Sequence, residues 1–261
     1  MIGRMERAYA RLAFECAESL QEKYPELDAE AKWIAGGVAL FAGAESPLTQ
    51  AHGMGFDGVV LHEHLEELED FYAERDCVAV LDACEAADES LFEVLLERGY
   101  RVTDTKHVLS RSLDDFEELE EPEVEDLTIL VGPGPEWGEV VAEGFYPDID
   151  LPLYLRAIFH TYLDIETSVC FLAFIGDEPA GGGALGVYDE IGMLYSASVL
   201  PEFRGRGIQK ALLHARMEYA RAAGCDYAMV FTAPNSTSEQ NVMKIGFEKA
   251  YEKYKLVAPS S

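Results

Sequence analysis

The sequence predicts an α/β protein made of two similar units. Each half contains the same order of elements: an amphipathic helix, a short buried strand, a helix that stops at glycine and a final strand. The two glycines, Gly99 and Gly246, lie 147 positions apart, and an aromatic residue follows each of them. A run of acidic residues separates the halves. Together these observations favour an internal repeat of an α/β unit.

The elements of the first half follow from its apolar spacing. Leu61, Leu65, Leu68 and Phe71 recur at helical intervals, which indicates a helix with one buried face. The expected elements are a helix at 59–74, a strand at 76–83, a helix at 88–98 and a strand at 100–109.

The second half repeats this order after two short helices. The expected elements are helices at 136–144, 151–163 and 208–223, a strand at 226–233, a helix at 236–244 and a strand from 247 onward. Gly246 ends the last helix, as Gly99 does in the first half.

The acidic segment 114–126 predicts a linker. It combines a block of like charge with Pro122, so it cannot pack on itself. Residues before 127 hold 10 Lys and Arg against 32 Asp and Glu, which makes the first half far more acidic than the second. We therefore expect one domain at 1–120 and another at 127–261.

The overall charge argues against nucleic-acid and membrane partners. The 261 residues include 49 Asp and Glu but only 20 Lys and Arg, a net charge of −29 at pH 7, which repels phosphates. No apolar run approaches the roughly 18 residues of a spanning helix, and the first residues lack the pattern of a signal peptide. We expect a cytoplasmic protein, a monomer or homodimer, that binds neither nucleic acid nor membrane.

The five cysteines predict neither a disulfide framework nor a metal centre. They form an odd, scattered set without a CxxC pair, so free thiols are expected. His62 and His64 lie two positions apart on a helix and therefore point in different directions. We expect no metal site.

A strand, a turn and a helix at 194–213 form the most informative segment. Gly205 and Gly207 allow a tight turn, so that N–H groups converge at the start of the helix, where the helix dipole favours an anion. Arg204, Arg206 and Lys210 add three cations within seven residues of an otherwise acidic chain. The segment is typical of a phosphate-binding loop, although a glycine-rich turn with solvated arginines is the simpler alternative.

These residues resemble a known family. Arg204-Gly205-Arg206-Gly207-Ile208-Gln209 is similar to the R-x-x-G-x-G/A pyrophosphate loop of the GNAT superfamily of acyl-CoA-dependent N-acyltransferases. Val199 and Pro201 match the V-x-P lead-in, residues 235–242 resemble the N-x-x-S-x-x-x-Y motif, and Gly246-Phe247 matches its G-F close. The resemblance covers about 127–257.

The resemblance implies a fold and a cofactor. It implies two GNAT-like domains, each a mixed, mostly antiparallel twisted sheet flanked by helices, with acetyl-CoA bound to the second. The residues that it places against the cofactor are Ala197, Ser198, Val199, Arg204, Gly205, Arg206, Gly207, Ile208, Gln209, Lys210, Asn235 and Ser238. For Asn235 and Ser238, capping of the following helix is the alternative role.

The usual acid and base of the family are missing. Val242 stands where a tyrosine often protonates the thiolate, and Met193 or Tyr195 stands where a glutamate often acts as base. Tyr195 and Glu190 are the candidate catalytic residues. Asp189, Tyr251 and Tyr254 are further candidates, and positioning alone can also lower the barrier.

The first half lacks the loop's cations. Residues 54–58 align with 204–208, and Asp57 would face a phosphate there without an arginine. We therefore expect a degenerate GNAT-like domain without cofactor.

The predicted function is transfer of an acetyl or short acyl group from acyl-CoA directly to a primary amine. The net negative charge favours a small cationic acceptor. Phe145, Tyr146, Tyr154 and Tyr162 are expected to line its site, with Asp148 and Asp150 attracting its charge. The alternatives are a non-catalytic acyl-CoA-binding sensor or scaffold, and an interaction module whose acidic half docks a basic protein.

Overall fold

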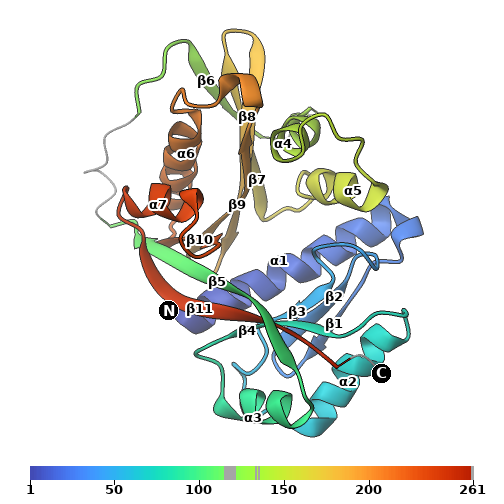
Figure 1. The fold of residues 1–261 in the computed structure, drawn as a ribbon. Coiled ribbons are helices and arrows are strands. Elements are labelled where there is room, and N and C mark those ends of the chain that lie inside the picture. The colour runs from blue at the N-terminus through green and yellow to red at the C-terminus, as the bar shows by residue number, and fades with distance from the viewer. Residues whose placement is uncertain (115–121, 133, 135, 260–261) are drawn as a thin grey trace. The chain divides into compact units, whose positions relative to one another are not determined.

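The computed structural model describes residues 1–114, 122–132, 134 and 136–259. The chain forms two compact units (Figure 1). Unit 1 comprises Met1–Leu109 and Phe231–Ser261, and unit 2 comprises Ser110–Val230.

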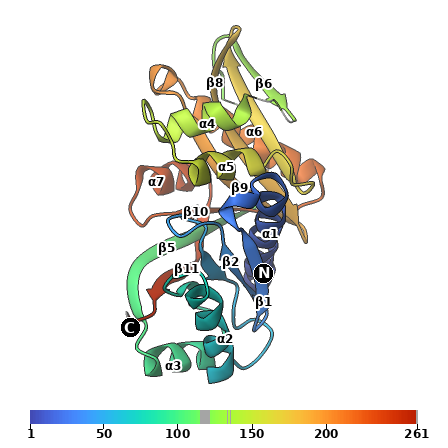
Figure 2. The same ribbon diagram turned by 90° about the vertical axis from the view of Figure 1, so that its right-hand side faces the viewer.

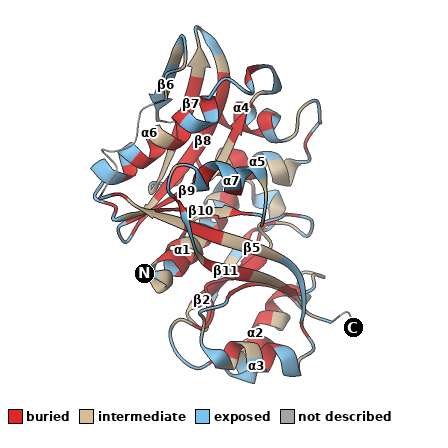
Figure 3. Ribbon diagram, turned by 60° about the vertical axis from the view of Figure 1, so that its left-hand side comes forward, coloured by how far each residue is buried: buried red, intermediate tan, exposed pale blue. Residues whose placement is uncertain are grey.

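The sheet of unit 2 is mixed and mostly antiparallel. Its strands follow the order β10-β9-β8-β7-β6, and only β10 runs parallel to its neighbour. Their bounds are β6 Leu127–Val131, β7 Ser168–Ile175, β8 Glu178–Tyr188, β9 Ile191–Val199 and β10 Tyr227–Thr232. Figure 3 shows that β8, in the middle of this sheet, is buried along most of its length.

Helices cover both faces of this sheet. α4 (Trp137–Phe145) and α5 (Leu153–Thr161) lie on one face and α6 (Ile208–Ala222) on the other (Figures 1 and 2). α4 approaches β8 closely because Gly182 has no side chain; a Cβ there would lie 2.8 Å from Val141. The buried Trp137 donates its indole N–H to the carbonyl of Phe171 at 3.1 Å, which fixes α4 to β7.

The strands of unit 1 also pack against helices. Its strand order is β1-β2-β3-β4-β11-β5, with bounds β1 Glu30–Ile34, β2 Gly37–Phe41, β3 Gln50–His52, β4 Val80–Cys84, β5 Arg101–Ser112 and β11 Glu248–Val257. Its helical elements are α1 Ile2–Lys23, η1 Pro25–Leu27, α2 His62–Ala73, α3 Glu89–Glu97 and α7 Thr237–Met243. α1 packs on the β1–β3 end, while Leu65, Leu68, Phe71 and Leu91 of α2 and α3 lie in a separate apolar cluster.

The final strand of the chain belongs to unit 1. β11 pairs antiparallel with β4, from Lys253 opposite Cys84 to Val257 opposite Val80. Residues 231–261 therefore lie with the N-terminal residues, whereas the sequence divides the chain near 114–126. That division stays a prediction, and residues 115–121 of the expected linker lie outside the described residues.

The predicted fold class is confirmed. The expected helices at 88–98, 208–223 and 236–244 appear as α3, α6 and α7 within one or two residues. The helix expected from Val59 begins only at His62. All five cysteines are free thiols. No described helix has the length and apolar character that crossing a bilayer requires.

Candidate functional site

Strands β9 and β10 are paired only at their beginnings. The parallel register joins Ile191–Leu194 to Tyr227–Val230. Within unit 2, Ser196, Ala197 and Ser198 of β9 therefore have no register partner on β10. Backbone groups on an unpaired edge are available to hydrogen-bond an extended ligand.

A β-bulge reshapes β9 at the same place. Gly182 pairs with Ser198 and Ala184 pairs with Tyr195, so Ser196 and Ala197 both lie opposite Gly183. Ser196 takes a left-handed backbone with φ +45°. A bulge bends its strand and interrupts the ladder. The backbone of β9 consequently changes direction directly after Tyr195.

The turn after β9 presents the start of α6. Gly205 and Gly207 have φ values of +79° and +87°, in the left-handed region that glycine adopts most readily. Gly207 is the N-cap of α6, and the N–H groups of Lys210 and Ala211 both reach its carbonyl. The first N–H groups of a helix lack intrahelical acceptors, so they point outward to an anion. This confirms the strand, turn and helix expected from the sequence.

The three cations of the turn have different roles. Arg206 and Lys210 are exposed, and the Arg206 guanidinium lies 5.2 Å from the centre of the Phe203 ring. Arg204 instead donates from Nε to the carbonyl of Val199 at 3.1 Å and from Nη2 to that of Gly144 at 2.8 Å. Arg204 thus ties the end of α4 to the end of β9, and its charge already faces two carbonyls.

The other residues predicted to contact the cofactor lie in different surroundings. The Ser198 hydroxyl is buried and donates to the carbonyl of Val141 at 2.8 Å, so this side chain holds α4. Ile208 is 1% exposed and belongs to the core. Gln209 is exposed at the start of α6, while Ala197 lies on the unpaired edge of β9 and Val199 is the last residue of that strand.

Asn235 and Ser238 belong to unit 1. Neither caps α7, because Ser236 is its N-cap and accepts the N–H of Glu239 at 3.1 Å. The Asn235 N–H donates to the Glu239 carboxylate, and the other oxygen of that carboxylate bonds His107. The bond to His107 holds the pKa of Glu239 below its ordinary value. Asn235 and Ser238 are therefore described within unit 1, apart from the turn at Gly205, which belongs to unit 2.

Tyr195 is the candidate catalytic residue nearest to the bulge. Its hydroxyl donates to Ser168 Oγ at 2.8 Å, and its ring lies 4.8 Å from that of Tyr162. Glu190 lies in the turn that precedes β9, with φ +64°. Tyr195 lies five positions further along the strand, about 16 Å away at the usual rise. The structure therefore does not bring Glu190 to the bulge.

The two other tyrosine candidates lie in unit 1. The buried Tyr251 hydroxyl donates to Glu6 at 2.7 Å, and that of Tyr254 donates to Glu252 at 3.1 Å. Burial raises the pKa of both phenols. Each hydroxyl is thus engaged by a carboxylate within unit 1.

The aromatic residues expected at the acceptor site do not all gather. Tyr162 is buried beside Tyr195, whereas Phe145 is 47% exposed and stacks on Phe159 at 5.8 Å between centroids. Asp148 and Asp150, on the connection between α4 and α5, are both exposed. Sequence reasoning missed Ser168, which had no motif to mark it.

The corresponding helix of the first half has a different start. α2 begins three residues after its expected position, so Gly58 is not at its N-cap as Gly207 is in α6. Its N-cap is Leu61, whose N–H donates to His64 Nδ1 of the same helix at 3.0 Å. His62 contacts Glu97 at 2.9 Å. Among the described residues, no group of three or more His, Cys, Asp or Glu is arranged to hold a metal.

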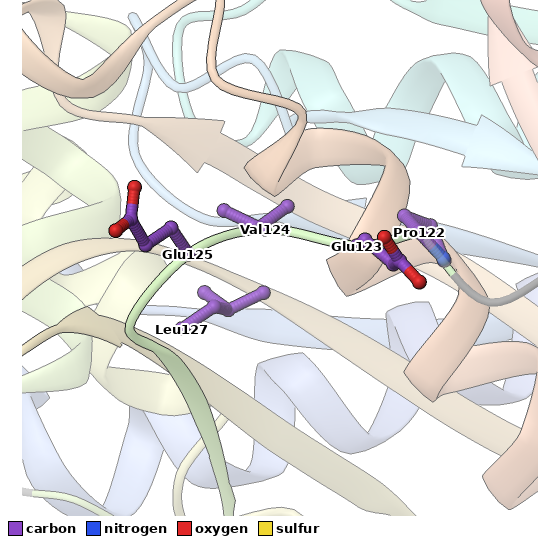
Figure 4. Close-up of a pocket in the computed structure, with 5 residues that line it drawn as sticks. All are labelled: Pro122, Glu123, Val124, Glu125 and Leu127. Atoms are coloured by element: carbon purple, nitrogen blue, oxygen red, sulfur yellow. The ribbon is translucent and has the colours of Figure 1, made fainter.

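An open cavity of about 660 Å³ lies beside the segment that leads into β6. Figure 4 shows its lining residues, Pro122, Glu123, Val124, Glu125 and Leu127. A Cβ on Gly207 would lie 3.3 Å from Val124, so this segment passes the start of α6. The two carboxylates disfavour an anion inside the cavity itself.

The diverging strands, the bulge and the glycine turn belong to a fold that solved N-acetyltransferases share. Among solved structures, a GCN5-related N-acetyltransferase from Kribbella flavida has a TM-score of 0.64 at 16% identity and covers 97% of this chain and 96% of its own. A tandem GNAT protein from the clavulanic acid biosynthesis pathway has a TM-score of 0.64 at 14% identity, covering 86% and 79%. A similar protein from Sphaerobacter thermophilus has a TM-score of 0.58 at 16% identity, covering 97% and 93%. These likenesses show the fold.

A family match covers part of the chain. Residues 136–247 match the acetyltransferase (GNAT) family, and this part of the chain is a GNAT acetyltransferase domain. The protein is therefore an acyl-CoA-dependent N-acetyltransferase that moves an acyl group from acyl-CoA to an amine. No curated protein sequence matches the chain significantly.

Proposed function

We propose that unit 2 binds acetyl-CoA along β9 and at the start of α6, and transfers the acetyl group directly to a primary amine on a small cationic acceptor. The observation that carries the binding proposal is the turn itself. Two left-handed glycines open the N-terminus of α6, with Arg206 and Lys210 exposed beside it in a chain of net charge −29. Cations at that position favour a pyrophosphate, whose charges they and the helix dipole offset.

The unpaired edge of β9 is the proposed contact for the extended arm of the cofactor. Ala197 and Ser198 contribute through their backbone, because the Ser198 hydroxyl is already bonded to Val141. Val199, whose carbonyl accepts from Arg204, remains a proposed contact through the sequence resemblance alone. Asn235 and Ser238 remain proposed contacts through their sequence motif alone. Arg204 shapes the turn instead of meeting the phosphates.

Direct transfer is favoured by the state of the cysteines. An acyl-cysteine intermediate needs a thiolate near neutral pH. Burial raises the pKa of Cys170 to about 12, of Cys225 to about 11 and of Cys84 to about 12. Burial also raises the pKa of Cys16 and of Cys77. All five thiols are therefore protonated and poor nucleophiles.

A cationic acceptor is supported by the charge near the α4–α5 connection. Asp148 and Asp150 are exposed there, and the N–H of Asp148 donates to Glu143 at 3.0 Å. Such carboxylates raise the local concentration of protonated amines. Tyr195 is the proposed catalytic hydroxyl, because it stands at the bulge; its hydroxyl donates to Ser168 Oγ at 2.8 Å.

We propose no cofactor for the first half. His64 already accepts the N–H of Leu61 at the start of α2. Asp57 precedes that helix, and no arginine lies near it in the sequence. The cytoplasm is the proposed compartment, supported by the five free thiols.

An acceptor panel tests this proposal. Acetyl transfer is measured with linear diamines, neutral amines and amino acids of similar length, at low and high salt. We expect the highest kcat/KM for diamines, falling with ionic strength because the attraction is screened. Asp148→Asn with Asp150→Asn should raise KM for diamines and leave neutral amines unchanged. Turnover confined to neutral or anionic amines would refute the cationic acceptor.

A further inference from the structure

One buried cation in unit 2 lies outside the sequence motif. Arg216, in the middle of α6, is 2% exposed and forms no ion pair with any described carboxylate. Its guanidinium donates from Nε to the carbonyl of Leu212 at 3.0 Å. From Nη1 it donates to the carbonyls of Ala184 at 3.2 Å and Tyr195 at 3.4 Å.

The last two acceptors are the register pair at the bulge. Ala184 and Tyr195 face each other across β8 and β9, directly before the point where the register shifts. A bulge interrupts the ladder, and a buried carbonyl without a donor is costly. Arg216 supplies that donor, so one side chain of α6 hydrogen-bonds both carbonyls at the bulge.

Gly183 makes room for this arrangement. It lies opposite Ser196 and Ala197 of β9, and a Cβ there would lie 3.0 Å from Arg216 Cζ and 3.1 Å from Ala197 Cβ. The missing side chain thus admits the guanidinium against the bulge. Three residues from three elements, Gly183, Ala197 and Arg216, are fitted to one another.

We propose that Arg216 is a positioning residue for acetyl transfer: by holding the bulge, it orients the backbone of Ser196, Ala197 and Ser198 toward the acyl carbonyl of the bound thioester. This rests on the proposed binding of acetyl-CoA along β9. The attacking amine converts that carbonyl into an oxyanion, which needs donors placed beforehand.

The charge of Arg216 adds to the effect. Burial lowers its pKa to about 10, which still leaves the guanidinium protonated at neutral pH. Because the guanidinium is bonded only to carbonyls, no described carboxylate neutralises its positive charge. That charge therefore acts strongly on groups near the bulge, where the dielectric is low. A hydrophobic residue of similar length would fill the volume without that potential.

The test compares Arg216→Met, Arg216→Lys and Gly183→Ala with Met217→Leu, a control at a fully buried position of the same helix. Two readouts are measured: the ¹³C shift of the carbonyl in bound [1-¹³C]acetyl-CoA, and the dissociation constants of acetyl-CoA and of CoA. In the wild type we expect a downfield shift on binding. Arg216→Met should lose most of it, while the affinity for CoA stays within about twofold.

Arg216→Lys should retain part of the shift because it keeps the charge, and Gly183→Ala should lose part because it displaces the guanidinium. If Arg216→Met does not fold, the ¹³C shift in Gly183→Ala tests the inference instead. A shift that stays at the Met217→Leu value in Arg216→Met, or in Gly183→Ala, overturns the inference. Failure of the wild type to bind acetyl-CoA would instead refute the proposed function, so the two failures are distinguishable.

Discussion

Lys253 is a charged residue that unit 1 buries completely. Its ammonium donates to Glu6 at 2.6 Å and lies 3.6 Å from Asp82, and all three side chains are fully buried. Although burial alone lowers the pKa of Lys253, the charge of Glu6 raises it above its ordinary value. The two carboxylates therefore stabilise the buried ammonium of Lys253.

Removal of Lys253 should destabilise unit 1 strongly. Lys253→Met leaves Glu6 buried without its cation, whereas Asp82 keeps Lys106 at 3.5 Å; loss of one partner of a buried pair typically costs about 3–5 kcal/mol. Urea unfolding measures the loss. Lys249→Met, which removes an exposed pair with Glu252, is the control and should change the midpoint far less. Glu6→Gln added to Lys253→Met should restore part of the stability; equal midpoints for the two lysine variants would contradict this.

His52 should make the stability of unit 1 dependent on pH. Burial lowers its pKa to about 4. Below the ordinary value of about 6.5, the unfolded chain takes up a proton that the folded chain refuses until about pH 4. As the pH is lowered from about 6.5 to about 4, the free energy of unfolding should therefore fall by about 1.4 kcal/mol per pH unit.

Denaturation at several pH values measures this slope. His52→Gln should reduce it, because the titrating group is gone. His62→Gln, on the exposed face of α2, is the matched control and should keep it. A slope that survives His52→Gln would assign the dependence to other groups.

Single elements show how far the sequence determined this fold. α3 and α6 were predicted within one or two residues because apolar periodicity and a following glycine are local signals. The start of α2 was placed three residues early, since Val59 and Val60 continue the apolar pattern before the helix begins. The pyrophosphate turn was recognisable from Gly205, Gly207 and their cations.

The missed features depend on contacts between distant residues. Nothing in the sequence near Arg204 shows that its guanidinium will meet Gly144, sixty residues away. The same holds for Arg216, whose partners Ala184 and Tyr195 lie on two other elements. An arginine on an amphipathic helix is ordinarily solvated, so burial of this one has no local sign.

The glycine turn yields a prediction at the element scale. Gly207→Ala must adopt φ +87° and approach Val124 at 3.3 Å, whereas Gly205→Ala meets only the backbone penalty because the space around it is open. A left-handed backbone at a residue with a side chain costs about 1 kcal/mol or more. Calorimetry should therefore give weaker acetyl-CoA binding for both variants, with Gly207→Ala the weaker. Unchanged affinity in both would show that the turn does not hold the phosphates.

At the scale of the whole molecule, unit 1 is built from both ends of the chain. Glu6 of α1 bonds Tyr251 and Lys253 of β11, and β11 completes the pairing of β4. Local patterns do not specify which sheet a terminal strand joins. The predicted division near 114–126 followed composition, which carries no information on this pairing.

A fragment experiment follows from this arrangement. Residues 1–126 expressed alone lack β11, so Glu6 and Asp82 lose Lys253, and we expect no cooperative unfolding transition. The same fragment joined by a flexible Gly/Ser linker to residues 231–261 should regain one. Thermal unfolding followed by circular dichroism measures both. A cooperative transition in 1–126 alone would show that the first half folds without the last strand.

The central claim, a single acyl-CoA site at the start of α6, is tested most directly by calorimetric titration with acetyl-CoA. Wild-type protein and Arg206→Glu are compared at fixed salt. We predict one site per chain in the wild type and at least a tenfold weaker affinity in Arg206→Glu, because a carboxylate replaces an exposed cation at the turn. Two sites per chain, no binding, or equal affinity in both proteins would contradict the account.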